Sequence, residues 1–454
     1  MPVDYFTQSP SMWWRWAPAV LAFLCAVSVL PVIFLGRDVT SEAFDQQIAH
    51  LPAIEQFAGQ LPAPDLSNYP SATGPGYHLL LSVPARLGFG VQWLRVLSSL
   101  AGVGLVLVAW RGGARTAGPG VAFALALPLA FSTYVLSGSA WLTTDVLSVL
   151  VGSAVVLIAA WSVPDRRTFL SLAVLLAAAL AIRQTNVFLA VPILAAGILG
   201  SPLGRSASDA EQWHGDEPRR WSRLAWACLA LLPGMLLLLA LVRAWGGLVP
   251  PAFRDLHDRG LNPIAPAYGM ALVGVWGGIA LLPMGAEVLR AVRTHRLAVA
   301  LLVLFAVIVA AIPESSWSRD EGRWGGALWQ AVKSFPVIGG RSTLLVAAAG
   351  LGTLLLSALW IRAAEVRRGR QATIVIMTLL ALFVVQVGNS QVWERYFDPA
   401  ILVALAWLTA LGIDRTRPHS AGRAVLGAVL LAAAQLGISA LGYWAPAFGL
   451  IAVP

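Results

Sequence analysis

Charge is scarce in this chain of 454 residues, because Asp, Glu, Lys and Arg together make up only 12% of it. A soluble domain usually carries about twice that share. Hydrophobic residues reach 58% and gather in many long apolar runs, which is typical of an integral membrane protein. Lys333 is the only lysine, and the arginines that produce the net charge of +9 stand at the ends of apolar runs. Basic residues spread in this way argue against nucleic acid as a partner.

Motifs for metals, nucleotides and disulfides are also missing. The two cysteines, Cys25 and Cys228, both lie within apolar runs, and there is no Walker loop, dinucleotide-binding glycine fingerprint or HExxH sequence. We therefore predict no metal and no other cofactor, so that any reaction must use a substrate that is already activated. The first apolar run has no convincing cleavage site and is predicted to be a membrane helix rather than a signal peptide.

The apolar runs predict an all-α polytopic membrane protein with about 13 transmembrane helices, within a range of 11 to 14. The stretch 77–89 is short and contains Pro84 and Arg86, so we expect it to lie on the membrane surface. The predicted spans are 16–35, 93–110, 120–136, 141–161, 169–182, 187–199, 224–242, 267–284, 297–312, 344–361, 372–387, 400–413 and 424–441.

The distribution of arginine predicts the orientation. One set of connections contains 19 of the 31 basic residues, which by the positive-inside rule places the amino terminus in the cytoplasm and the carboxyl terminus outside. We predict a single transmembrane domain over 1–454, a first outer loop with juxtamembrane helices at 37–92, a cytoplasmic linker at 201–223 and a further outer loop at 313–341. The outer loops are the longer and chemically more varied ones, so we expect the site there.

The first outer loop contains the most polar candidates. Asp45, His50 and Glu55 are predicted to lie on an amphipathic helix whose apolar face is formed by Phe44, Ile48, Leu51, Ile54 and Phe57. Pro52 leaves two short helices as an alternative, and a plain solvated face would explain the charges equally well. The turn that follows, Ser71 to His78, contains glycines that permit close backbone approach. The alternative is an ordinary structural turn.

Two further candidates lie at the ends of apolar spans. Asp145 begins a long apolar run, where an ionisable group indicates function, although a helix cap formed with Thr143 and Thr144 is the alternative. Arg183 to Asn186 reads Arg-Gln-Thr-Asn between two apolar runs, which suits an anion-binding cavity or a tight loop with a snorkelling arginine. Arg323, Lys333 and Arg395 in later outer loops add cations that, with Arg183, are predicted to surround one cavity suited to phosphate.

These residues resemble a known family, the terminal α-1,2-glucosyltransferases of lipid-linked oligosaccharide assembly, which are GT-C superfamily enzymes that use dolichyl-phosphate glucose. The most specific match is Arg183-Gln184-Thr185-Asn186, which reproduces a motif of that family. The others, which follow in the family's order, are Asp45-Gln46 with His50-Leu51-Pro52, Thr73-Gly74-Pro75-Gly76, Thr143-Thr144-Asp145, Asp320 to Trp324, and Glu394-Arg395-Tyr396-Phe397.

The resemblance implies a GT-C-like fold and an inverting transfer of a hexose, glucose in the first instance, from a polyprenyl or dolichyl phosphate to an acceptor hydroxyl outside the cytoplasm. Asp45 is the expected base, with Asp145 as the alternative, and Arg183, Arg395, Lys333 and Arg323 are expected to bind the donor phosphate. The residues expected to contact the sugars are His50, Gln46, Gln184, Asn186, Tyr77, His78 and Glu394. The expected partners are the lipid-linked donor, a glycan or lipid-linked acceptor and membrane lipid, for a monomer in a bacterial inner membrane.

A transporter or flippase of lipid-linked sugars is the rival interpretation, and a membrane scaffold without chemistry is a third. A transporter should carry polar groups deep within several spans. Here the polar candidates gather at one face, which favours an enzyme.

Overall fold

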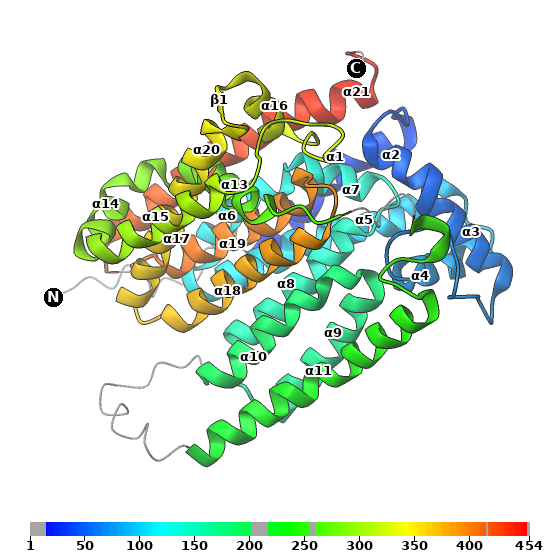
Figure 1. Ribbon diagram of the computed structural model, residues 1–454, viewed down its shortest axis with the longest axis horizontal. Helices are drawn as coiled ribbons and strands as arrows, with labels where there is room; N and C mark the ends of the chain where they lie inside the picture. The colour runs from blue at the N-terminus through cyan, green and yellow to red at the C-terminus, as the bar shows by residue number, and fades with distance from the viewer. Residues whose placement is uncertain (1–14, 201–216, 255–259, 415, 452–454) are drawn as a thin grey trace.

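The computed structural model describes residues 15–200, 217–254, 260–414 and 416–451, and these form an all-α polytopic membrane protein (Figure 1). Residues 201–216 of the predicted linker 201–223 lie outside the described residues. The remaining residues, 217–223, form the first turns of α11 (Glu217–Trp245). The longer helices are α1 (Ala17–Leu35), α5 (Val91–Ala117), α6 (Pro119–Ala130), α8 (Asp145–Trp161), α9 (Arg166–Ile182), α10 (Ala190–Leu199), α11 (Glu217–Trp245), α13 (Ala265–Leu281), α14 (Gly285–Thr294), α15 (Arg296–Ala311), α17 (Thr343–Glu365), α18 (Gly369–Val385), α19 (Asp398–Leu411) and α20 (Pro418–Ser439).

Shorter elements occupy the connections. They are α2 (Ser41–Asp45), η2 (Gln46–His50), α3 (Leu51–Gln60), α4 (Gly76–Arg86), α7 (Thr133–Ala140), η3 (Gln184–Leu189), η6 (Pro251–Phe253), η7 (Leu282–Met284), α16 (Ala327–Ser334), β1 (Val337–Ile338), β2 (Arg341–Ser342), η8 (Gln386–Gly388), η9 (Glu394–Tyr396), η10 (Ala440–Trp444) and α21 (Ala445–Ala447). The two strands pair antiparallel, with Val337 opposite Ser342.

All thirteen predicted spans coincide with helices, but not all of these helices are long. By length and composition, the described residues contain 7 helices that suit a membrane crossing, or 8 if α6 and α7, which bend by 67°, form one broken span. The other predicted spans lie on α8, α9, α10 with η3, α15 and α19, each of which has 17 residues or fewer. The polytopic class is thus confirmed, and the number of spans stays a prediction.

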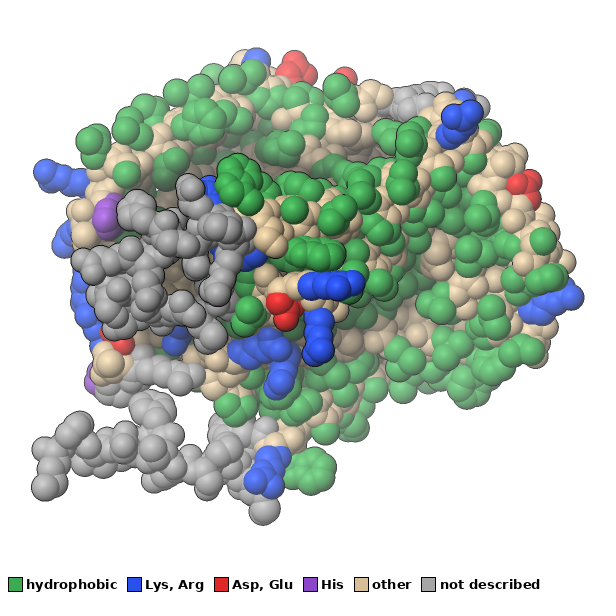
Figure 2. All heavy atoms as spheres, turned by 90° about the horizontal axis from the view of Figure 1, so that it is seen from below, with side chains coloured by type: hydrophobic (Ala, Val, Ile, Leu, Met, Phe, Trp, Pro, Cys, Tyr) green, Lys and Arg blue, Asp and Glu red, His purple; other side chains and the backbone are tan. Residues whose placement is uncertain are grey.

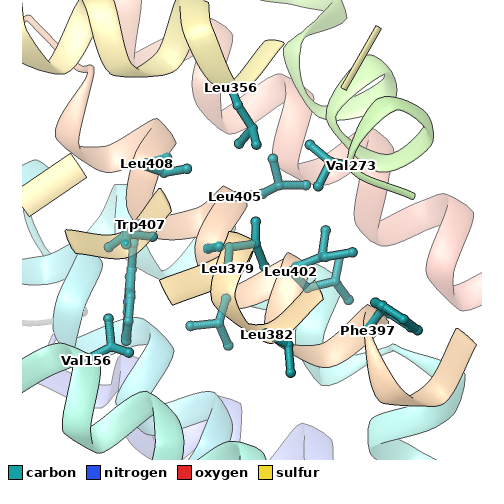
Figure 3. Close-up of a cluster of buried hydrophobic side chains, with 14 of the residues drawn as sticks. Val156, Val273, Leu356, Leu379, Leu382, Phe397, Leu402, Leu405, Trp407 and Leu408 are labelled. Carbon is teal, nitrogen blue, oxygen red and sulfur yellow. The ribbon is translucent and has the colours of Figure 1, made fainter. Parts of the chain in front are cut away.

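Three helices occupy the middle of the bundle. Helices α8, α18 and α19 lie between a group formed by α13, α15 and α17 and a group formed by α9, α10 and α11 (Figure 1). Every residue of α19 except Ala400 is buried, as expected of a helix that is apolar on all sides. Leu379 and Leu382 of α18 pack beside Leu402 of α19, and Trp407 extends toward Val156 of α8 (Figure 3).

The outer surface of the bundle is apolar. Large hydrophobic side chains are exposed on α1, α11 and α15, among them Phe23, Leu236 and Phe305. Figure 2 shows one face of the molecule, where many hydrophobic side chains are exposed and Lys and Arg side chains gather in a cluster and toward the two ends. A surface of this kind is stable only in contact with lipid.

Arginines from the predicted cytoplasmic connections meet at one end of the bundle. Arg370 donates to the carbonyl oxygens of Ala159 and Ala160, and Arg368 donates to three carbonyl oxygens around the end of α19. Helix carboxyl ends carry unpaired carbonyls and partial negative charge, which cations stabilise. These arginines therefore close the ends of α8 and α19, in agreement with the predicted grouping of the loops.

The predicted first outer loop contains a continuous helical run from Ser41 to Gln60, so Pro52 does not divide it; the proline occupies the first turn of α3. Its predicted apolar face is partly wrong. Ile54 and Phe57 are buried, but Phe44 and Ile48 are exposed, while Gln46 and His50 face inward. The polar side chains are buried because they have partners there, whereas Phe44 and Ile48 suit a lipid surface. The predicted surface helix at 77–89 is α4.

Glycines allow α13 and α17 to approach closely, and this contact gives a test of the fold. A Cβ atom at Gly274 would overlap the carbonyl oxygen of Ala348, whereas one at Gly278 would have Leu351 Cδ2 as its nearest neighbour, at 3.7 Å. Because backbone cannot yield as a side chain does, we expect Gly274→Ala to lower stability by about 1–3 kcal/mol. Gly278→Ala should be neutral or stabilising. Thermal unfolding in detergent measures both, and equal midpoints for the two variants would contradict this packing.

Candidate active site

Two aspartates and two arginines from distant parts of the chain meet at one end of the bundle. Asp45 ends α2, Asp145 begins α8, Arg183 joins α9 to η3, and Arg395 lies in η9. Arg183 Nη1 pairs with Asp145 Oδ1, Arg395 Nη1 lies 2.6 Å from Asp45 Oδ2, and Arg395 Nε lies 4.0 Å from Asp145 Oδ2. The four side chains form one alternating set of charges, which we call the charge cluster.

Tyr396 is part of this cluster. Its ring centroid lies 5.2 Å from the guanidinium carbon of Arg183 and 5.2 Å from that of Arg395, and its hydroxyl accepts a hydrogen bond from Arg395 Nη2 at 3.3 Å. Trp393 lies under Arg395 at 4.3 Å. Aromatic faces attract cations, so the two rings fix the directions in which the arginines point.

The structure decides two of the alternatives left by the sequence. Thr144 is the N-cap residue of α8 and makes no side-chain cap hydrogen bond, and the Asp145 carboxylate turns to Arg183 instead. Asp145 is therefore a partner in an ion pair rather than a helix cap. Arg183 does not snorkel outward, because its side chain is 18% exposed and points at that carboxylate.

A cavity opens beside the charge cluster. Its polar end is lined by Asp145, Arg183, Asn186, Gln386, Arg395 and Tyr396. From there it follows one face of each of three helices, along residues spaced by three or four positions. These residues are Ser148, Val149, Gly152, Ser153 and Val156 of α8, Val375, Thr378, Leu379 and Leu382 of α18, and Ala400, Val403, Ala404 and Trp407 of α19. The cavity is thus charged at one end and mainly apolar along its length.

Gln184 and Asn186 hold the segment that carries Arg183. Asn186 Oδ1 accepts from Ser148 Oγ at 3.0 Å, and its Nδ2 donates to Ala179 O at 2.8 Å. Gln184 Nε2 donates to the carbonyl oxygens of Ala72 and Leu248. These contacts attach the Arg-Gln-Thr-Asn segment to α8, to the Ser71–His78 turn and to the loop after α11.

Close packing explains the glycines of that turn. A Cβ atom at Gly74 would overlap the carbonyl oxygen of Ala181, and one at Gly76 would lie 3.0 Å from the same residue. The turn therefore packs directly on the last turn of α9, next to Arg183, and its glycines have a structural function.

A polar layer lies behind the charge cluster. His50 Nδ1 and His78 Nε2 are 3.0 Å apart in a stacked pair, and Tyr77 shares a hydrogen bond of 2.9 Å with Ser98. Burial lowers the pKa of His78 to about 4. Burial also holds the pKa of His50 well below its ordinary value, and the charges of His78, Arg183 and Arg395 lower it further. Both imidazoles are therefore neutral at physiological pH.

Gln46 belongs to the same layer. Its Oε1 accepts from Arg95 Nε at 2.9 Å and from the backbone N–H of Leu142 at 3.1 Å. Gln46 thus joins the first outer loop to α5 and to the turn that leads into α8. This contact holds the end of α2, and with it Asp45, close to the start of α8, where Asp145 lies.

Glu394 precedes Arg395 but has a different environment. Its Oε2 accepts from the backbone N–H of Leu328 at 2.9 Å and from the Tyr268 hydroxyl at 3.3 Å, which attaches η9 to α16 and α13. Burial, followed by the charge of Asp398, raises the pKa of Glu394 to about 8.

Arg323 and Lys333 do not line the cavity beside the charge cluster, so the prediction that all four cations surround one cavity is wrong. Arg323 pairs with Glu314 at 3.7 Å and Glu321 at 3.3 Å, and it lines a second, more polar cavity together with Arg319. Lys333 stacks on Trp317 at 4.6 Å. Carboxylates close in sequence neutralise Arg323 within its own loop, whereas Arg395 finds its carboxylates only in distant segments.

Sequence reasoning missed Tyr396 and Gln386 as members of the site. Tyr396 stood beside Arg395 in a motif already singled out, and Gln386 is a polar residue near the end of an apolar run, which is a signal of function. No group of three or more His, Cys, Asp or Glu side chains in the described part of the chain is arranged to hold a metal. The absence of a metal requirement stays a prediction.

Residues 72–213 match the family model described as dolichyl-phosphate-mannose-protein mannosyltransferase. The matched stretch includes Tyr77, His78, Asp145, Arg183 and Asn186. The match supports the GT-C resemblance without selecting the dolichyl-phosphate-glucose family. No curated protein matches the chain.

Two solved structures are similar to the chain at low identity. The crystal structure of ArnT from Cupriavidus metallidurans bound to undecaprenyl phosphate has 16% identity and a TM-score of 0.49, over 95% of this chain and 66% of that one. The structure of ArnT from the same organism in the apo state has 14% identity and a TM-score of 0.42, over 95% of this chain and 78% of that one. The chain thus spans just under two thirds of the length of the first.

The raised pKa of Glu394 predicts a pH-dependent stability. The folded state keeps the proton to about pH 8, while the unfolded chain loses it near 4.5, so stability should fall as pH rises between these values and level off above. Glu394→Gln keeps an acceptor for Leu328 and removes the titration. We expect the unfolding midpoint of the wild type to fall relative to that of Glu394→Gln across this window. Glu55→Gln, on the exposed face of α3, is the control, and parallel curves for all three proteins would contradict the assignment.

Proposed function

We propose that the protein is an inverting membrane glycosyltransferase that moves a hexose, glucose in the first instance, from a polyprenyl-phosphate carrier to an acceptor hydroxyl. The observation that carries the proposal is the cavity that begins at Arg183 and Arg395 and continues along the apolar faces of α8, α18 and α19. The family description, which names a dolichyl-phosphate-linked hexose, supports the same class of donor.

The polar end suits the phosphate of such a donor. Two guanidinium groups offer several N–H donors in fixed planes, which is the geometry that binds phosphate oxygens well. Fixed positive charge at the departing phosphate also stabilises the charge that develops there during transfer. Arg183 and Arg395 take this function, and Tyr396 holds their orientation.

The apolar faces suit the isoprenoid chain. Gly152, Ala400 and Ala404 leave room along the cavity, while Val156, Leu379 and Trp407 supply apolar contacts. A prenyl chain there would bury hydrocarbon against hydrocarbon, whereas a soluble nucleotide sugar would gain nothing from this surface. The donor is thus a lipid phosphate.

Asp45 is the proposed base, and Asp145 remains the alternative. Asp45 has the more accessible carboxylate, with a side chain 25% exposed against 13% for Asp145, and it comes from the outer loop from which an acceptor would approach. Seven further residues contact the sugars or position the residues that do so. They are His50, His78, Tyr77, Gln46, Gln184, Asn186 and Glu394.

The reaction belongs on the extracytoplasmic side if the arginine-rich end of the bundle is cytoplasmic. The charge cluster lies at the carboxyl end of α9 and the amino ends of α8 and α19, while the arginine contacts close the opposite ends of α8 and α19. With the amino terminus in the cytoplasm, a bacterial inner membrane would present this site to the periplasm. We propose a monomer, because the charge cluster is complete within one chain.

The rival function is transport of a lipid-linked sugar. A transporter needs a polar path across the membrane, but the described cavity becomes apolar as it leaves the charge cluster and runs to Trp407. This arrangement favours the enzyme.

Transfer of sugar from radiolabelled polyprenyl-phosphate glucose to membrane-extracted acceptors tests the proposal. We expect Asp45→Asn to lower the rate by about 10²- to 10⁴-fold, the usual contribution of a general base. Asp145→Asn tests the alternative base, and Glu55→Gln in the same outer loop is the control that should keep full activity. Full turnover by Asp45→Asn would refute its assignment. A wild type inactive with all donor sugars tried would favour the transporter.

A further inference from the structure

Arg395 pairs with a carboxylate at the position where the phosphate of the proposed donor would bind. Its Nη1 lies 2.6 Å from Asp45 Oδ2, its Nη2 donates to Tyr396, and Trp393 lies under its plane. The residue is 8% exposed, so it has little freedom to turn toward a second anion. An anion that takes the Nη1 donor now facing Asp45 must therefore replace that carboxylate.

The contact between Asp45 and Arg395 is an ion pair with poor hydrogen-bond alignment. Within the described residues, Nε and Nη1 of Arg395 are buried and have no partner of hydrogen-bond geometry, although both lie near carboxylate oxygens. Buried N–H donors without such partners weaken a structure. A phosphate oxygen in the place of Asp45 can align with the Nη1 donor, which makes phosphate a competitor for it.

We propose that Asp45 and the donor phosphate compete for Arg395, so that binding of the donor frees Asp45 to act as the base. This inference rests on the proposed function and adds an order of events to it. While Asp45 Oδ2 pairs with Arg395, this oxygen is engaged and cannot accept the proton of an acceptor hydroxyl. The donor therefore binds first, and its phosphate releases Asp45 Oδ2 for the proton of an acceptor hydroxyl.

The charges are consistent with this exchange. The cluster of two arginines and two aspartates is neutral in total, and the sugar-linked donor is a phosphodiester with one negative charge. In the transfer, the acceptor oxygen bonds to the anomeric carbon as its proton passes to Asp45, and the bond from that carbon to the phosphate oxygen breaks with its electron pair on the oxygen. The product is a phosphate monoester with up to two charges. It holds Arg395 until it leaves, after which Asp45 returns its proton to solvent and pairs again.

Equilibrium binding of undecaprenyl phosphate to the full-length protein in detergent tests the exchange without any turnover. Asp45→Asn should bind this probe at least about tenfold more tightly than the wild type, because the competing carboxylate is gone. The same substitution should lower transfer by about 10²- to 10⁴-fold, so affinity and activity should change in opposite directions.

The variant Glu42→Gln distinguishes competition between two anions for Arg395 from a simple change in net charge. Glu42 is a buried carboxylate whose charge acts on Arg395 without pairing with it, and its Oε2 accepts from Ser41, which glutamine also permits. We expect its affinity for the probe to stay within about twofold of the wild type. An equal gain in Glu42→Gln and Asp45→Asn, or no gain in Asp45→Asn, would overturn the exchange.

A double variant completes the test. In an Arg395→Gln background, whose folding is checked by thermal unfolding, Asp45→Asn should no longer improve binding, because the group that the two anions share has been removed. A gain that persists there would also overturn the exchange. If the wild type and all variants fail to bind undecaprenyl phosphate, the proposed function fails and this inference fails with it. If all of them bind the probe equally well, only the exchange fails.

Discussion

Burial of two arginines in an apolar bundle requires two carboxylates beside them, and much of the arrangement at this end of the molecule follows from that requirement. An unpaired guanidinium in such surroundings is costly, so Arg183 and Arg395 each have an aspartate within reach. Neither aspartate is close to its arginine in sequence. Pairing them draws together the first outer loop, the start of α8, the break between α9 and η3, and the short η9 before α19.

Short and interrupted helices are a consequence of the same pairing. A full span would carry α9 through the membrane surface without a break, but Arg183 adopts an extended backbone and ends the helix beneath the turn at Gly74. Similarly, α8 and α19 begin at charged residues instead of continuing outward. The remaining faces of α8 and α19 are apolar and line the cavity together with α18, so that the apolar wall continues from the segments that carry the charges.

The helices could be predicted well from the sequence, but the site only in part. The difference has a physical reason. Apolar runs and the Arg-Gln-Thr-Asn segment are local signals, and each appears in the structure where the sequence indicated. The partner of a charge is not always local. Arg323 pairs with Glu321, two residues away, whereas nothing near Arg395 in the chain reveals that it reaches Asp45. The buried face of the first outer helix was misjudged for the same reason, because Gln46 and His50 turn inward to partners far along the chain.

Glu394 and Arg395 show how one short segment serves two environments. In η9 adjacent side chains diverge, so the arginine joins the charge cluster while the glutamate accepts hydrogen bonds from Leu328 and Tyr268. Gly326 approaches Glu394 so closely that a side chain there would collide with it, and its φ of +128° also favours glycine. The outer loop that carries Gly326 is thereby fixed to the residue next to the proposed phosphate ligand. A displacement of this loop would be transmitted directly to Arg395, because Glu394, which the loop contacts, and Arg395 are adjacent residues of η9.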